Sequence, residues 1–446
     1  MTVQSDWTSG TNWTSETNWT SETNWAGNHV YRAAGFAQPT SLAELQEIVS
    51  RHEHVRALGS RHSFNDLSDT EGELVDLTRM PEELELEEDR RSVTVAGGMR
   101  YGRLAEALHA RGWALANMAS LPHISVAGAV ATGTHGSGDR NANLSAAVSA
   151  LEAVGPDGEL YRVARGDSDF DGSVVALGTL GIVTRLELDM EPTFEVRQRI
   201  YTELPWSAVH ESFDAITSSA YSVSLFTDWV GDHVSQVWVK SRDDAPAGSS
   251  AGAQLFGAQF SGAKFFGAEP AAATVHMLSG AAVESVTEQG GVAGPWHERL
   301  PHFRMAFTPS RGEELQSEYF VRRRDAQSAF AALRAMGALL APVLQVSEIR
   351  TIAQDTLWLS GAYGDDMVGL HFTWIRDNDA VNAVLAALES ALLPLGARPH
   401  WGKCFVASRD AIAQMYPRLE DFRQLRRRVD PARKFGNAFL ARTIGA

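Results

Sequence analysis

The sequence predicts an α+β fold with at least two domains. A chain of 446 residues suggests about two or three domains, and its 44% hydrophobic residues are enough to bury a sizeable core. Strand-like segments dominate residues 146–190, after which Glu191-Pro192 marks a plausible domain boundary. Beyond this boundary, strands alternate with helices, which is the pattern of a mixed α+β domain.

The N-terminus carries a polar repeat. Trp7, Trp13, Trp19 and Trp25 recur with a period of six residues, between stretches such as WTSETN. The repeat is too short and too polar to bury a core of its own. We therefore interpret it as a duplicated leader before a folded part that begins near Thr23.

Caps and apolar spacing define the elements of the first half. Ser41 and Glu44 form a capping box, and Leu45 and Val49 share one face of the helix that follows. We expect strands at residues 55–58, 73–77 and 92–96, a second helix from about residue 101, and a tight turn at residues 155–158.

The second half alternates between strands and helices. We expect strands at residues 317–321, 344–352 and 368–375, and helices at residues 326–340 and 380–393. Residues 245–267 are dominated by alanine, glycine and serine, so we expect a surface excursion there.

Charge and cysteine content exclude several classes of protein. The net charge of −16 argues against binding to nucleic acid or to anionic lipid. Cys404 is the only cysteine, so neither an internal disulfide nor a thiolate metal cluster can form. The N-terminus shows no basic segment followed by an apolar one, so no secretory signal is visible. The apolar stretch 330–346 is interrupted by Arg334, Gly337 and Pro342, so we interpret it as a buried helix and not as a membrane span. We expect a cytoplasmic protein without nucleic-acid or membrane partners.

Two polar segments are candidates for ligand binding. His62 lies in GSRHSFN, between small residues, which is not the setting of a core histidine. Residues 120–138 are nearly all small, and we expect little regular structure there. Their glycines permit backbone conformations whose N–H groups hold anions. The spacing G-x-x-G-x-G is not the dinucleotide fingerprint, so a nucleotide would be held in another way. A flexible glycine loop is the alternative.

No metal site is expected. Residues 167–172 open like a calcium-binding loop, but the twelfth position is Gly178, where that loop needs a bidentate glutamate.

Polar side chains interrupt three apolar segments of the second half. The strand period of two places Glu348 and Arg350 on one face, and likewise His371 and Thr373. In RPHWGKCF the same period places Lys403 opposite Cys404. If the three segments are neighbouring strands, they present these polar groups to one concave space. Burying such groups is costly unless they pair with one another or bind a ligand. A structural ion-pair cluster is the open alternative.

Six segments in order resemble the alditol oxidases, which include the xylitol oxidases and belong to the vanillyl-alcohol-oxidase flavoprotein superfamily. They are GSRHSFN, NMASLPHISVAGAVATGTHGSG, SEIRT, LHFTW, RPHWGK and DPARKFGNAFL. The resemblance runs from about Asn24 to the C-terminus. It implies a leader at residues 1–23, an FAD-binding domain at 24–195, a central substrate (cap) domain at 196–408, and a segment at 409–446 that returns to the FAD domain.

The resemblance also implies roles for single residues. It makes His62 the covalent attachment point of FAD, and it makes His371 and Lys403 the groups that ease removal of the hydroxyl proton. The polyol-binding residues are Ser120, Glu348, Arg350, Thr373 and Lys403. The cofactor-binding residues are Gly59, Ser60, Arg61, His62, Ser63, Ser120, Ser125, Gly128, Thr132, Gly133, Thr134, His135, Val183 and His400.

The expected function is oxidation of a sugar alcohol. The resemblance implies a monomeric FAD enzyme that converts the terminal CH2OH of xylitol or sorbitol to the aldose, with O2 reduced to H2O2. An aldonolactone oxidase or dehydrogenase, which shares the HWGK-like segment, is the nearest rival. A rival of another class is a non-catalytic flavin- or sugar-binding protein.

Overall fold

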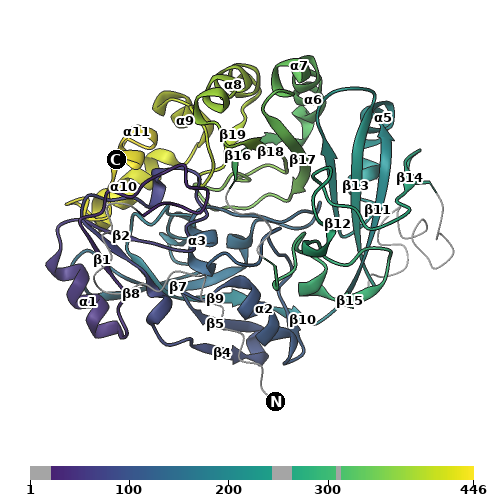
Figure 1. The fold of residues 1–446 in the computed structure, drawn as a ribbon. Coiled ribbons are helices and arrows are strands. Elements are labelled where there is room, and N and C mark those ends of the chain that lie inside the picture. Colours follow the sequence, from purple (N-terminus) through teal and green to yellow (C-terminus); the bar gives the residue numbers. More distant parts are fainter. Residues whose placement is uncertain (1–21, 244–263, 308–312, 446) are drawn as a thin grey trace.

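The structure describes three stretches of the chain. The computed structural model places residues 22–243, 264–307 and 313–445. The repeat before residue 22 and residues 245–263 of the expected surface excursion therefore lie outside the described residues. Figure 1 shows the sheets of the first half below, the large sheet of the second half above and to the right, and the C-terminal helices beside the first strands.

Among the described residues, three sheets build the first half of the chain, which extends to Pro192. Its strands are β1 (Gly35–Ala37), β2 (Val55–Ala57), β3 (Glu73–Val75), β4 (Leu84–Glu87), β5 (Ser92–Ala96), β6 (Trp113–Ala114), β7 (Val148–Val154), β8 (Leu160–Ala164), β9 (Ile182–Asp189) and β10 (Glu191–Pro192). The sheets are the parallel β1-β3-β2, the antiparallel β4-β5-β9-β7-β8 and the pair β10-β6. Four helices accompany them: α1 (Leu42–Arg51), α2 (Tyr101–His109), α3 (Val126–Ala131) and α4 (Phe170–Ser173).

One large sheet builds the second half. Its strands are β11 (Glu195–Pro205), β12 (Ser222–Thr227), β13 (His233–Arg242), β14 (Glu269–Pro270), β15 (Ala293–Pro295), β16 (Glu314–Arg322), β17 (Leu344–Ile352), β18 (Met367–Ile375) and β19 (Arg398–Pro399). The order is β14-β11-β13-β12-β17-β18-β16-β19, and β15 also pairs with β11. The helices are α5 (Trp206–Thr217), α6 (Ala326–Ala335), α7 (Gly337–Leu340) and α8 (Asn378–Leu392).

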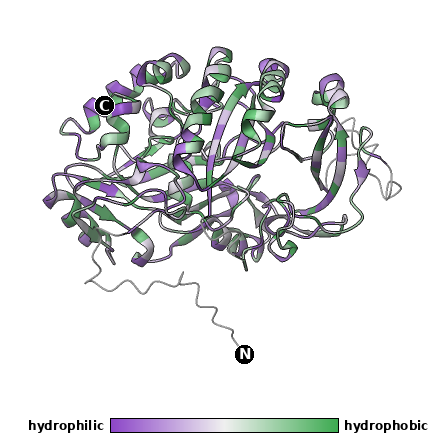
Figure 2. Ribbon diagram, turned by 45° about the horizontal axis from the view of Figure 1, so that its top comes forward, coloured by the Kyte–Doolittle hydropathy of each residue, from purple (hydrophilic) through white to green (hydrophobic). Residues whose placement is uncertain are grey.

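Strand alternation gives the large sheet two different faces. Leu370, Phe372 and Trp374 of β18 are buried in one core with residues of α5, α6 and α8, and the rings of Phe372 and Trp374 stack 5.1 Å apart. His371 and Thr373 alternate with them and therefore point to the other face, toward the first half. Figure 2 shows hydrophobic and hydrophilic residues alternating along the covering helices as well. One face thus supplies a core and the other supplies polar groups.

The end of the chain packs on the first half. It forms α9 (Arg409–Met415), α10 (Leu419–Val429) and α11 (Ala438–Thr443). Phe422 and Leu440 lie in the same hydrophobic cluster as Val93 and Leu186 of the first half. Within the described residues, no helix combines the length and the apolar character needed to cross a membrane.

Three expectations about local structure are wrong. The small-residue segment 120–138 contains a helix, α3, because burial of Val126, Ala129 and Val130 outweighs the low helix propensity of its glycine. The helix expected at residues 326–340 is two helices, with Gly337 at the break. The strand expected around Lys403 ends at Pro399, and Lys403 lies in a turn, where its N–H bonds the carbonyl of His400.

Arg56 ties β2 to three distant segments. Its side chain donates to the carbonyls of Leu67, Leu177, Gly178 and Phe435 at 2.6 to 2.9 Å. Burial, with Arg426 nearby, lowers the pKa of Arg56 to about 9, so the guanidinium stays charged at pH 7.

We expect Arg56→Leu to destabilise the fold by at least about 3 kcal/mol, because several buried carbonyls lose their donor together. The melting temperature measures this loss. Arg51→Leu is the control, since the exposed Arg51 pairs only with Glu47 one turn away. Equal melting temperatures for the two variants would contradict the assignment.

Candidate active site

The polar face of the large sheet carries a row of charged residues. In the strand register, His371 of β18 lies opposite Glu318 of β16 on one side and Glu348 of β17 on the other. Because residues that pair directly point to the same face, these three side chains form one row across three strands. The alternation predicted this face for Glu348 and His371. The third strand of the row is β16, however, and not the segment around Lys403.

Glu318 is the centre of the cluster and was missed in the sequence. Its carboxylate is 2.7 Å from Nζ of Lys403, 3.1 Å from Nε2 of His135 and 3.3 Å from a terminal guanidinium nitrogen of Arg350, and its side chain is 1% exposed. A Cβ on Gly369 would lie 3.2 Å from this carboxylate, so the glycine leaves it room. A lone acid inside the apolar strand LQSEYFV is the signal that could have found it.

The side chains around Glu318 keep its carboxylate ionised. Burial by itself raises the pKa of Glu318, but Lys403, His135 and Arg350 outweigh burial and hold the pKa well below its usual range. For Lys403 the balance is the reverse: burial lowers its pKa, and Glu318 opposes this effect. The cluster therefore holds a carboxylate and an ammonium group in direct contact with little water around them.

The residues expected to bind a polyol surround this pair. Arg350 donates to Oγ of Ser120 at 3.1 Å, and its Nε lies 3.5 Å from Oε1 of Glu348. Ser120 comes from the first half and Arg350 from the second, so the two halves share the site. Thr373 is buried on the same strand face, in register with Gln316. The structure thus brings Ser120, Glu348, Arg350, Thr373 and Lys403 to one region.

His371 is a neutral group with a defined orientation. Burial lowers its pKa well below the usual range, and Lys403 adds to this effect. Its Nε2 lies 3.1 Å from Oε1 of Gln316, whose amide nitrogen donates to Glu314. The oxygen of Gln316 can only accept, so His371 carries its proton on Nε2, and Nδ1 is the acceptor of the ring.

The His62 loop is held by segments from both ends of the chain. The Trp25 N–H donates to the carbonyl of Arg61 at 2.9 Å, and the Phe64 N–H donates to the carbonyl of Gly402 at 2.8 Å. The rings of Trp25 and His62 are 5.0 Å apart. Burial, then His123 and two arginines, lowers the pKa of the half-buried His62 to about 3. His62 is therefore a neutral imidazole with a lone pair at pH 7.

The residues around this loop fit the phosphate part of an FAD molecule. Within the described chain, the backbone N–H groups of Gly59, Ser60, His62 and Ser63 donate no hydrogen bond, which leaves them for an anion. The buried Oγ of Ser125 also lacks a partner among the described residues. A Cβ at Gly59 or at Gly128 would lie 2.6 Å from that oxygen, so both glycines keep the cradle open.

The remaining expected cofactor residues lie in the segment that follows α3, on β9, in the Lys403 turn and, for Arg61, in the His62 loop. The hydroxyls of Thr132 and Thr134 are 3.2 Å apart, and Gly133 between them has φ of 65°. The rings of His135 and His400 are 6.1 Å apart, close to Glu318. Arg61 adopts a left-handed conformation with φ of 60°. Val183 lies on β9, where its carbonyl faces Gly97.

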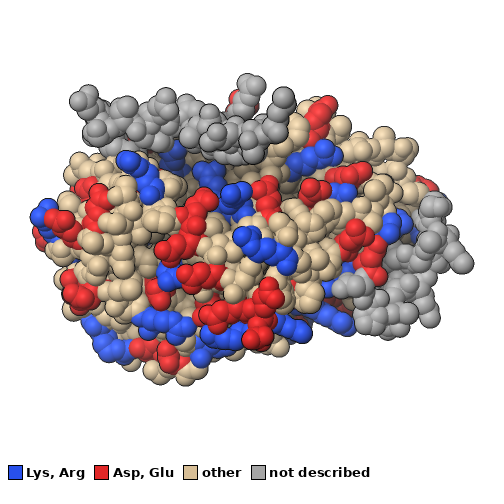
Figure 3. Space-filling view, turned by 90° about the horizontal axis from the view of Figure 1, so that it is seen from below, with Lys and Arg blue, Asp and Glu red and all other residues tan. Residues whose placement is uncertain are grey.

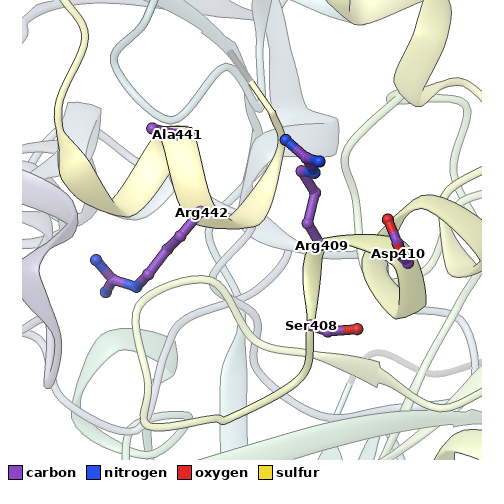
Figure 4. A pocket seen from close by; sticks show the side chains of 5 residues that line it. All are labelled: Ser408, Arg409, Asp410, Ala441 and Arg442. Carbon is purple, nitrogen blue, oxygen red and sulfur yellow. The ribbon is translucent and has the colours of Figure 1, made fainter.

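Two surface hollows lie apart from the cluster. The hollow in Figure 4 has a volume of about 290 Å³ and is lined by the residues labelled there, of which Arg442 pairs with Asp66. The other, of about 370 Å³, is lined by Arg323, Arg324 and their acidic neighbours. Neither shares a residue with the buried cluster.

Surface charge and metal ligands add no further site. On the face in Figure 3, the described acidic and basic side chains are interspersed. No group of three or more histidine, cysteine or acidic side chains in the described residues is placed to hold a metal ion.

Comparisons with known proteins identify the family of the chain. Residues 33–164 match the model of an FAD binding domain, and residues 307–443 match that of D-arabinono-1,4-lactone oxidase. The chain is 47% identical to an alditol oxidase of Streptomyces sp., across 93% of this chain and 97% of that protein. It is 26% identical to L-gulono-1,4-lactone dehydrogenase of Mycobacterium tuberculosis, across 94% and 98%.

Solved structures share the fold. A solvent-stable cholesterol oxidase superposes with a TM-score of 0.74 at 15% identity, across 96% of this chain and 97% of that chain. The cholesterol oxidase from B. sterolicum gives 0.72 at 13% identity, across 94% and 96%. At such low identity these likenesses concern the fold alone. Together with the matched FAD binding domain and the alditol oxidase relative, they confirm the predicted two-domain α+β architecture of the vanillyl-alcohol-oxidase type.

The buried histidines predict loss of stability in acid. Burial lowers the pKa of His302 to about 4, and it lowers those of His371 and His400 well below the usual value. The unfolded chain binds protons from about pH 6.5 downward, whereas the folded chain does not. Stability from these groups is therefore complete above pH 6.5 and falls below it, by about 1.4 kcal/mol per histidine and pH unit.

We expect the melting temperature to fall steadily from pH 7 to pH 5. The carboxylates Glu318 and Glu348, with lowered pKa values, add their loss only below about pH 4.5. His302→Gln should show a shallower dependence, because Gln does not titrate. A melting temperature that stays constant between pH 7 and pH 5 would exclude the neutral, buried state of these histidines.

Proposed function

This chain belongs to the alditol oxidase family of FAD-dependent oxidoreductases, and on that premise we propose that it oxidises the terminal primary hydroxyl of an open-chain sugar alcohol such as xylitol or sorbitol. The reaction converts R–CH2OH and O2 to R–CHO and H2O2. The observation that carries the proposal is the buried contact of Lys403 with Glu318, beside Arg350 and Glu348.

The substrate chemistry fits these side chains. A polyol is uncharged and bears hydroxyls along its whole length, so its site needs both donors and acceptors at fixed positions. Arg350 and Lys403 supply donors, Glu348 supplies an acceptor, and Ser120 and Thr373 supply both. Arg350 is oriented by Ser120, Glu318 and Glu348 together, so its remaining donor direction is defined before the polyol arrives.

Two side chains assist removal of the proton from the substrate hydroxyl. In this proposal Lys403, held by Glu318, acts as the cation that stabilises the alkoxide developing on the substrate oxygen. Neutral His371 offers Nδ1 as the acceptor for this proton, although burial makes the ring a weaker base than a free imidazole. FAD, when bound, supplies the electron acceptor of this oxidation.

We assign FAD to the cradle at residues 59–63 and 125–135, with His62 as its covalent attachment point. The neutral imidazole supports this assignment, because only the unprotonated ring has the lone pair needed for a covalent bond. In this proposal the first half and the C-terminal segment bind FAD, and the central large sheet binds the polyol.

A substrate panel with peroxide detection tests the function. We expect peroxide from xylitol and sorbitol in air, and little from gulono- or galactonolactone. The chain also resembles an L-gulono-1,4-lactone dehydrogenase and matches the model of D-arabinono-1,4-lactone oxidase, so the lactones are the informative competing substrates. Activity on the lactones alone would overturn the proposal in favour of an aldonolactone oxidase. Absence of turnover with all substrates by a yellow, folded protein would indicate a binding protein.

We predict that flavin remains with the acid-precipitated protein and that His62→Ala releases it. The yellow colour should stay in the wild-type pellet and move to the supernatant in the variant. His52→Ala, at the exposed end of α1, is the control and should retain the colour. A wild-type pellet without flavin absorbance would disprove the covalent bond.

We predict that Lys403→Ala keeps its yellow flavin but loses turnover by about two to four powers of ten. The variant removes the cation next to the reacting oxygen and leaves the His62 loop intact. Lys264→Ala, whose lysine is exposed and pairs with Glu269, should react as the wild type does. Wild-type turnover by Lys403→Ala would remove Lys403 from the mechanism.

A further inference from the structure

A buried lysine and histidine stand behind the polyol-binding residue Glu348. Lys240 of β13 is 1% exposed. Its Nζ lies 2.5 Å from the carbonyl of Leu300, 3.2 Å from that of Pro301 and 3.1 Å from Nδ1 of His302. Burial lowers the pKa of Lys240 to about 7, although Glu348 opposes this effect, so near neutral pH its amino group carries two or three hydrogens and faces three acceptors. Neither Lys240 nor His302 is among the residues assigned above to FAD binding, polyol binding or proton removal.

The second ring nitrogen of His302 contacts the site itself. Nε2 lies 2.8 Å from Oε1 of Glu348, and both side chains are 6% exposed. Although burial raises the pKa of Glu348, Arg350 and His302 hold it well below the usual range, so this carboxylate is ionised and can only accept. Nε2 of His302 must therefore carry the hydrogen, and Nδ1 must accept from Lys240. The two partners fix one tautomer of a neutral ring.

Packing fixes the ring plane as well. The His302 ring lies 5.1 Å from that of Trp238 and 5.6 Å from that of Phe226, both in edge-to-face arrangements. Phe226 of β12 is also the register partner of Glu348. The histidine thus has little freedom to turn away from the carboxylate.

The same segment holds a second polyol-binding residue. The backbone N–H groups of His302 and Phe303 both donate to the carbonyl of Ser120, at 3.1 and 3.2 Å. Thr287 anchors the segment through its hydroxyl to the carbonyl of Pro301 and through its N–H to that of His302. The turn at residues 300–303 therefore connects Ser120 of the first half to Glu348 of the second.

The two oxygens of Glu348 have different surroundings. Oε1 accepts from Nε2 of His302, and it forms an ion pair with Arg350, whose Nε is 3.5 Å away. No hydrogen bond joins Oε2 to a described residue. Oε2 is also not one of the fully buried atoms that lack a partner. This oxygen is the one available to a hydroxyl group.

We propose that His302, oriented by Lys240, is a positioning residue for polyol recognition: it holds Oε1 of Glu348 so that Oε2 accepts a substrate hydroxyl. The inference rests on the proposed function, because it assumes a polyol at Glu348. It adds a residue that touches neither substrate nor cofactor and that acts through another side chain.

Two nearly isosteric variants separate this role from a role in packing alone. In His302→Gln the amide nitrogen replaces Nε2 as donor to Glu348, whereas in His302→Asn the amide oxygen replaces Nδ1 and the donor is lost. We expect His302→Asn to raise the KM for xylitol about tenfold to a hundredfold, the value of a hydrogen bond to a charged group, with kcat changed less than about threefold. His302→Gln should recover most of the affinity.

His276→Asn is the matched control. This buried histidine accepts from the N–H of Leu278 and contacts Phe303, but it has no contact with Glu348. We expect wild-type kinetics from it. Melting temperatures of all three variants report how much each loses in packing.

The outcomes distinguish this inference from the proposed function. Failure of the wild type to oxidise xylitol defeats the function. If the wild type oxidises xylitol, two results defeat the inference alone. One is an equal KM for His302→Asn and His302→Gln, and the other is a wild-type KM for His302→Asn. The ¹⁵N shifts of His302 in the wild type, assigned through the proximity of its ring to the rings of Trp238 and Phe226, decide even if the variants fail to fold. A proton on Nε2 between pH 6 and pH 8 supports the inference, and a proton on Nδ1 overturns it.

Discussion

A buried ionised carboxylate joins the parts of this molecule. Glu318 on β16 contacts His135 from the first half, Arg350 of β17 and Lys403 from the segment that leads to the C-terminal helices. An isolated carboxylate at this depth would be strongly unfavourable, so these partners must come close for it to remain charged. The site is thus formed only when three distant segments are in place.

The large sheet makes this arrangement possible through its two faces. Tyr319 and Phe372 pack against the helices on one side, while Glu318 and His371 alternate with them and face the first half. The apolar side supplies the burial that stabilises the sheet. The polar side can then hold groups that would weaken a core, because their partners lie across the interface between the halves.

The groups proposed for ligand recognition are divided between the two halves in the same way. On the side of the first half, backbone N–H groups at residues 59–63 and the Ser125 hydroxyl offer donors, and small residues keep the backbone accessible. On the side of the sheet, long charged side chains offer directed contacts, and each is oriented by a neighbour. Gly402 links the two, since its carbonyl accepts from Phe64 of the His62 loop while the next residue is Lys403.

The sequence by itself determined most of the secondary structure and much of the site. Alternation identified β17 and β18 and placed Glu348 with Arg350, because the side-chain period of a strand is local. The capping pair Ser41 and Glu44 located α1 for the same reason. The ordered motifs indicated the family and the candidate residues for FAD and polyol.

Only the tertiary structure decided which polar groups meet. Glu318 and His302 were missed because each stands alone in its own segment, and their partners are set by strand register and by a turn that crosses between the halves. The helix α3 and the turn at Lys403 were missed because packing and hydrogen bonds to distant residues, such as that of His400 to Glu318, outweigh local propensity. Periodicity is a property of neighbours in the chain, whereas an ion pair depends on the distance between residues that the fold alone brings together.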